Sequence, residues 1–137
     1  MELIIDRTES DALLGNEKGV YSFFDMNRVE KAVAEITAEF PSLGIGFMLA
    51  TKTDWGLPDD FSGEKWPIAS QLRRYLDNVV SIKKIFSVAV RLPESMDKLN
   101  WESANNIERV LQTAQSRIQG IKQSYHYSGE VFAGEEI

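Results

Sequence analysis

Apolar residues recur at helical spacing in three separate segments of the chain. Within each segment the successive apolar positions are three, four, three and four residues apart, which places them on one stripe of an α-helix. The three stripes are Met26, Val29, Val33, Ile36 and Phe40; Leu72, Tyr75, Val79, Ile82 and Phe86; and Ala104, Ile107, Leu111, Ala114 and Ile118. Because the offsets between the stripes are unequal, the pattern favours three helices of one bundle over a solenoid of fixed period.

Residues that start and stop helices flank each stripe. Ser22 opens an S-x-x-D pattern typical of a helix start, and Pro41 follows the first stripe. Pro67 suits the first turn of the second helix, Asn100 is a favourable N-cap for the third, and Gly120 lies near its expected end. The sequence therefore predicts a mainly α fold, a three-helix bundle that forms a single helical domain over residues 1–137. The predicted core helices are 22–40, 67–86 and 100–120.

The segments before and between these helices are less regular. Residues 1–20 form a short N-terminal element, in which 2–5 suit a short strand and Thr8 opens a short helix. The connection over 41–66 is too long to be only a loop in a compact domain. Its apolar portion, 45–51, suits either a strand or an extension of the first helix, and the remainder is rich in turn-forming residues.

Aromatic side chains suggest where the protein contacts partners. The C-terminal residues 122–137 repeat a small aromatic–small–Gly–Glu unit, and glycine disfavours helix. We therefore predict an extended tail, as an edge strand or as an arm that docks on another subunit. Trp55, in the long connection, is the tryptophan best placed for an exposed role. The candidate interaction residues are Trp55, Tyr125, Tyr127 and Phe132.

Composition and charge narrow the classes of function. The chain has 137 residues, of which 43% are hydrophobic and 26% charged, the range of an ordinary globular domain. Lys and Arg number 15 and Asp and Glu 21, so the net charge of −6 argues against a nucleic-acid partner. The sequence contains no cysteine, one histidine, no targeting segment and no apolar run long enough to span a membrane. We expect a protein made in the cytoplasm of its producing cell.

Few residues combine into a catalytic or binding pattern. Asp59, Asp60 and Glu64 lie in a turn-rich stretch without the spacing of a calcium loop, and His126 has no carboxylate nearby in the sequence. We therefore expect no catalytic residue, no cofactor and no metal ion. The basic residues of the second predicted helix favour a solvated face that pairs with the acidic first helix. They are Arg73, Arg74, Lys83 and Lys84.

Four strings in the chain occur in a familiar order: DMNRVEKAV; TKTDWGLPDD followed by WPIASQLRRYLDNV; LPESMDKLNWESANNIERVL; and YHYSGEVFAGE. Together they resemble a family of small proteins encoded in the tail-gene regions of phages and prophages of Gram-positive bacteria. The residues that match its motifs are Asn27, Arg28 and Glu30; Thr53, Asp54, Trp55 and Asn78; Asn105, Asn106, Ile107 and Glu108; and Tyr127, Gly129 and Glu130. The chain departs from the pattern at Asn106, where the family usually has Asp, and its N-terminal stretch is shorter.

The resemblance implies a structural protein of the virion or tail, such as a baseplate or tail-fibre adaptor, and no enzyme. Its expected partners are other virion or tail proteins and copies of itself, with no nucleic acid, membrane or small-molecule substrate. The expected location is the phage tail, after synthesis in the cytoplasm of the host bacterium. Two other interpretations stay open: a cytoplasmic protein-binding or assembly-chaperone module, and a small hydrolase or lyase that uses Asp59, Asp60 or Glu64.

Overall fold

Helices dominate the computed structural model, which describes the backbone of residues 3–56 and 69–135 and the side chains of 3–56 and 70–124. The described part contains no β-strand, so the predicted mainly α class is confirmed. Its α-helices are α1 (Glu9–Leu14), α2 (Phe23–Thr37), α3 (Ala69–Ile85) and α4 (Trp101–Glu135). The same described part contains two short 3₁₀ turns, η1 (Pro41–Leu43) after α2 and η3 (Met96–Lys98) before α4.

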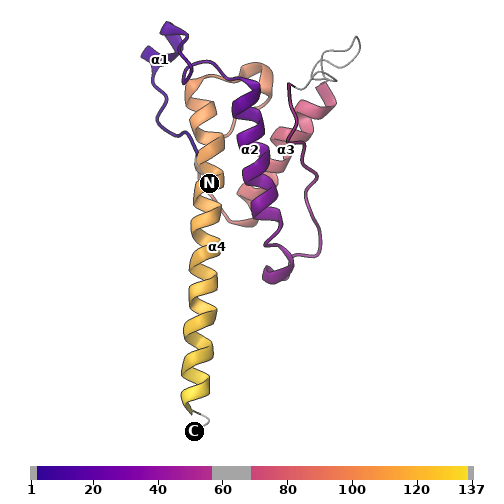
Figure 1. Cartoon of the computed structure of the whole chain (residues 1–137), viewed down its shortest axis with the longest axis vertical. Coiled ribbons are helices and arrows are strands. Elements are labelled where there is room, and N and C mark those ends of the chain that lie inside the picture. Colours follow the sequence, from indigo (N-terminus) through magenta and orange to yellow (C-terminus); the bar gives the residue numbers. More distant parts are fainter. Residues whose placement is uncertain (1–2, 57–68, 136–137) are drawn as a thin grey trace.

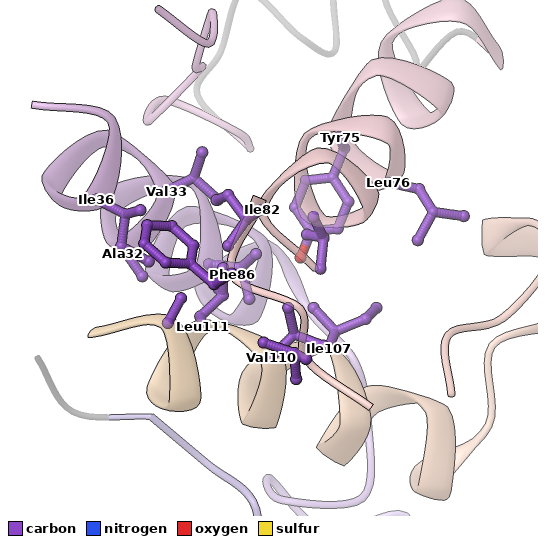
Figure 2. Close-up of a cluster of buried hydrophobic side chains, with 14 of the residues drawn as sticks. Ala32, Val33, Ile36, Tyr75, Leu76, Ile82, Phe86, Ile107, Val110 and Leu111 are labelled. Atoms are coloured by element: carbon purple, nitrogen blue, oxygen red, sulfur yellow. The ribbon is translucent and has the colours of Figure 1, made fainter. Parts of the chain in front are cut away.

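The core lies where α2, α3 and α4 pack against one another (Figures 1 and 2). Every residue of the three predicted stripes is buried, except Leu72, which is half-buried at the edge of the cluster. Val29, Val79, Ile107 and Leu111 are completely inaccessible to solvent. Burial of such side chains contributes roughly 1.5–3 kcal/mol each, which is why the apolar periodicity located the helices correctly.

Polar side chains close the helix starts as the sequence predicted. Thr8 and Asp11 form a reciprocal capping box at the start of α1. The Ser22 N–H donates to the Asp25 carboxylate at 2.8 Å at the start of α2. The Asn100 side chain accepts the Ser103 N–H at 2.7 Å at the start of α4. Each bond occupies a backbone donor that an uncapped helix would leave without a partner.

The C-terminal part of the chain differs from the prediction. α4 continues without interruption through Gly120 to Glu135, so the predicted extended tail over 122–137 is wrong as far as Glu135. The site of a Cβ on Gly120 faces open space. Glycine at an exposed position inside a helix costs about 1 kcal/mol relative to alanine, which a long helix tolerates. Figure 1 shows the last turns of α4 running well past α2 and α3.

Other predicted boundaries are also corrected. Residues 3–5 and 45–51 contain neither strand nor helix, and α2 ends at Thr37, before the turn that leads to Pro41. These stretches run beside the helices with no neighbouring strand, and side chains of α2, α3 and α4 supply many of their hydrogen bonds. Pro67, expected in the first turn of α3, lies outside the described residues.

Candidate functional site

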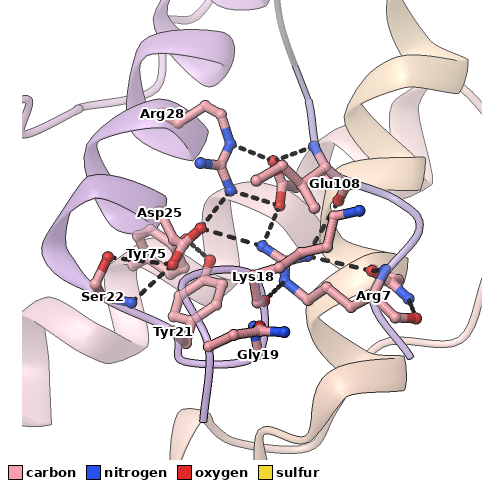
Figure 3. Close-up of polar contacts among 12 residues, drawn as sticks. Arg7, Lys18, Gly19, Tyr21, Ser22, Asp25, Arg28, Tyr75 and Glu108 are labelled. Atoms are coloured by element: carbon pink, nitrogen blue, oxygen red, sulfur yellow. Dashed lines mark hydrogen bonds and ion pairs between the residues drawn. The ribbon is translucent and has the colours of Figure 1, made fainter. Parts of the chain in front are cut away.

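Two guanidinium groups and two carboxylates form a buried network between the N-terminal segment, α2 and α4 (Figure 3). The Arg7 side chain, 1% exposed, contacts the Glu108 carboxylate at 2.7 Å and Asp25 at 3.2 Å. Arg28 contacts Asp25 at 2.6 Å and Glu108 at 2.7 Å. Because positive and negative groups alternate and are in equal number, each buried charge has a partner of opposite sign.

The same Glu108 belongs to a side-chain clamp that holds the backbone of residues 4–7 against α4. The Asn105 amide accepts the Arg7 N–H at 3.0 Å and donates to the Arg7 carbonyl at 2.9 Å. Glu108 accepts the Ile4 N–H at 3.0 Å. One turn of helix therefore supplies the hydrogen bonds that a neighbouring strand would otherwise supply to this segment.

A second clamp on α2 holds residues 52–55 in the same way. The Asn27 amide accepts the Trp55 N–H at 2.8 Å and donates to the Trp55 carbonyl at 3.0 Å. Glu30 accepts the Lys52 N–H at 3.0 Å. The Glu30 carboxylate also accepts the Trp55 indole N–H at 2.8 Å and two N–H groups of Arg74, the shorter at 2.7 Å.

We call these two sites the Asn-x-x-Glu clamps, at 27–30 and 105–108. In each clamp the Asn side chain bonds to both the N–H and the carbonyl of one residue, Arg7 or Trp55. The Glu accepts the N–H of the residue three positions earlier, Ile4 or Lys52. Each Glu also accepts a hydrogen bond from the side chain of that same residue and another from an arginine elsewhere in the fold. The signal was present in the sequence, because Asn27 and Asn105 hold equivalent places in two of the apolar stripes.

Helix α3 contributes further polar contacts next to the second clamp. Arg74 and Asn78 both donate to the Ala50 carbonyl, at 2.9 and 2.7 Å. The predicted pairing of the basic second helix with the acidic first helix is therefore confirmed at Arg74, which contacts Glu30. Among the described residues, the other three basic side chains of α3 form no ion pair with α2.

Trp55 does not have the exposed role that its place in the long connection suggested. The side chain is buried in the core cluster, 3% exposed, with its indole N–H on Glu30. The Lys52 ammonium lies 5.2 Å from the centre of its ring. The prediction of exposure was wrong because sequence position identifies a connection but not the helix face on which that connection packs.

Beside the ion network, two tyrosine hydroxyls from different elements meet. Tyr21 precedes α2, Tyr75 lies on α3, and their hydroxyls are hydrogen-bonded to each other. The Arg7 guanidinium stands 5.6 Å from the centre of the Tyr21 ring. Burial raises the pKa of Tyr21 and of Tyr75 well above the usual range, and the neighbouring Glu108 carboxylate adds to both increases.

Because of this tyrosine pair, we expect the free energy of unfolding to decrease at alkaline pH. Because both pKa values are raised in the folded state, this contribution is complete below the unfolded pKa of about 10 and is lost as the pH rises above it. The free energy of unfolding should fall by up to about 1.4 kcal/mol per pH unit for each tyrosine. Urea unfolding at increasing pH, with tyrosinate absorbance, measures this slope. A Tyr21→Phe, Tyr75→Phe double variant should flatten it, and an unchanged slope would contradict the assignment.

The remaining candidate residues have the following places. Asp59, Asp60 and Glu64 lie outside the described residues. Tyr125, His126, Tyr127 and Phe132 belong to the helical backbone of α4, and their side chains lie outside the described part. Within the described residues no group of three or more His, Cys, Asp or Glu side chains could hold a metal ion. No helix in the same part is long and apolar enough to cross a membrane.

The clamps hold the backbone of residues 4–7 and 52–55 in place. In the described part of the chain, every buried side-chain nitrogen and oxygen has a hydrogen-bond partner. Both clamp carboxylates are engaged by several donors, so their oxygens are committed to positioning neighbouring segments. The surface also carries open grooves, one of about 510 Å³ between α3 and η3 and another of about 550 Å³ along α2.

No family model, curated protein or solved structure matches this chain. The motifs of the tail-region resemblance can nevertheless be placed in the structure. Asn27, Glu30, Trp55, Asn105 and Glu108 all belong to the two clamps. These five residues therefore hold backbone segments in place within the fold.

Proposed function

We propose that this protein is a structural component of a phage or prophage tail, which assembles through protein–protein contacts and catalyses no reaction. The tail setting comes from the resemblance of its motifs. The proposal depends on one structural observation above all, the continuation of α4 beyond the bundle (Figure 1).

The length of α4 exceeds what the bundle needs. Its 35 residues span about 50 Å at 1.5 Å per residue, whereas α2 has 15 residues. Lys122 of α4 contacts Glu39, just beyond the end of α2, at 2.8 Å. Helices in proteins derive most of their stability from tertiary packing. A helix that continues past its own bundle is therefore suited to pack against another chain.

The clamps support the same proposal from inside the molecule. They tie the irregular segments 4–7 and 52–55 to α4 and α2 with side-chain bonds to backbone groups. Segments fixed in this way lose little further conformational freedom when a partner binds. A preorganised surface of this kind favours assembly.

The test is mass spectrometry of particles purified from the bacterium that carries the gene. We expect the chain in the particles at a fixed copy number relative to other tail proteins. Gly120→Pro should kink α4 near the point where it leaves the bundle, and we expect it to deplete the chain from particles at least about tenfold. Gly120→Ala is the matched control, since its Cβ meets open space and alanine strengthens the helix.

Circular dichroism should confirm that both Gly120 variants keep the bundle folded. A chain that is made in the cells but bound to a tail protein only before particles are complete would contradict the proposal and favour an assembly chaperone. Equal incorporation of both variants would show that the continuation of α4 is not the assembly element.

A further inference from the structure

A groove of about 510 Å³ lies between the first half of α3 and the turn η3. Its apolar lining comes from Leu72 and Leu76 of α3 and Met96 of η3. Leu76 is 5% exposed, and the other two are half-buried. We call it the α3–η3 groove. It offers a partner apolar contact area between two elements that the core already holds in place.

Carboxylates dominate the rim of this groove. Asp77 lies on the α3 side and Glu94 and Asp97 on the η3 side, against one cation, Arg73. Glu94 contacts Lys98 at 3.0 Å, but both side chains are largely exposed, so that pair is weak. Within the described residues, no ion pair engages Asp77 or Asp97. The groove thus presents an apolar lining under a negative rim.

We propose that the α3–η3 groove binds a cationic segment of a different protein, with apolar side chains against the half-buried Leu72 and Met96 and lysine or arginine near Asp77 and Asp97. This inference rests on the proposed function, because it names one partner through which the protein assembles. The Glu94 side chain is 83% exposed. Such an open rim suits a protein segment, whereas a small molecule is usually enclosed over most of its surface.

Electrostatics favours a different protein over a second copy of this chain. The chain carries a net charge of −6, so two copies repel each other at long range. A basic segment is instead attracted to the rim, and such complementarity raises the rate of association and excludes acidic partners. The apolar lining then supplies contact area that a surface of charges alone would lack.

Site-specific photocrosslinking in the producing bacterium tests this proposal. A photoreactive benzoylphenylalanine replaces Ser95, which lines the groove, or Gln112, an exposed control position on α4. We expect the label at 95, and not at 112, to join a segment of another protein that is net positive and contains apolar residues. In the labelled chain, the double variant Asp77→Lys, Asp97→Lys should lower this yield about five- to tenfold. Glu35→Lys, a single charge reversal on α2 that changes the net charge by half as much, should leave it unaltered.

The possible outcomes separate this inference from the proposed function. Capture of an acidic or uncharged segment, capture of a second copy of this chain, or no product from position 95 would overturn the inference. An unchanged yield in the double charge variant would do the same. If the chain is present in particles without the expected product, only the inference fails. If the product forms in cells and the chain is absent from particles, the groove assignment stands and the proposed function fails.

Discussion

Glu108→Gln is expected to lower the free energy of unfolding by about 3–5 kcal/mol, the usual cost of removing one member of a buried ion pair. The Glu108 side chain is wholly buried and faces both Arg7 and Arg28. The amide keeps the shape of the carboxylate but not its charge. It leaves two guanidinium groups with Asp25 as their remaining negative partner, and it places an N–H₂ group where acceptors are required.

Urea unfolding followed by circular dichroism measures this loss. Glu94→Gln is the matched control, since Glu94 pairs with Lys98 at the surface and should change the free energy by less than about 1 kcal/mol. Folded domains have only about 5–15 kcal/mol of stability in total, so the Glu108 variant should be visibly less stable at ambient temperature. A change as small as that of the control would show that the network contributes nothing beyond a surface pair.

Trp55→Ala is expected to cost about 3–5 kcal/mol, the range for removing a large aromatic side chain from a core. The substitution empties a volume in the cluster and leaves the Glu30 carboxylate without the indole N–H that it accepts at 2.8 Å. Trp55→Phe should cost less, because it retains most of the apolar contact and loses only that hydrogen bond.

Phe24→Ala provides the control for this second prediction. Phe24 is also aromatic and lies in α2, but it is 83% exposed, so its loss should change stability by less than about 0.5 kcal/mol. Thermal unfolding of the four proteins, including the parent chain, compares them directly. If Trp55→Ala were as stable as the parent, Trp55 would regain the exposed role that its position in the sequence suggested.

The positions of the core helices and their caps, which depend on local sequence, were predicted correctly. The stripe positions proved to be buried with one half-buried exception, and the capping residues Thr8, Ser22 and Asn100 lie at the starts of their helices. A cap requires only a side-chain oxygen two or three residues from a free N–H. A stripe requires only that one face of a helix meets other apolar residues.

The extended tail, which was inferred from local composition, was wrong. The buried polar contacts were not predicted, because their partners are distant in the sequence. Glu30 and Glu108 resemble solvated helix residues when considered alone, yet their exposed fractions are 1% and 0%. Asn105 and Arg7 are 98 residues apart in the chain, and no local rule connects them. The Asn-x-x-Glu clamps therefore cannot be predicted from either motif alone.

By itself the sequence determined that this protein is helical, where its three core helices lie and which face of each turns inward, because apolar periodicity and caps act over a few residues. Only the tertiary structure decided that Trp55 is buried and that four alternating charges lie between α2, α4 and the N-terminal segment. Burying a charged or amide group is favourable only when the fold brings its partners into contact. That condition depends on how distant segments meet in space, which periodicity along the chain does not record.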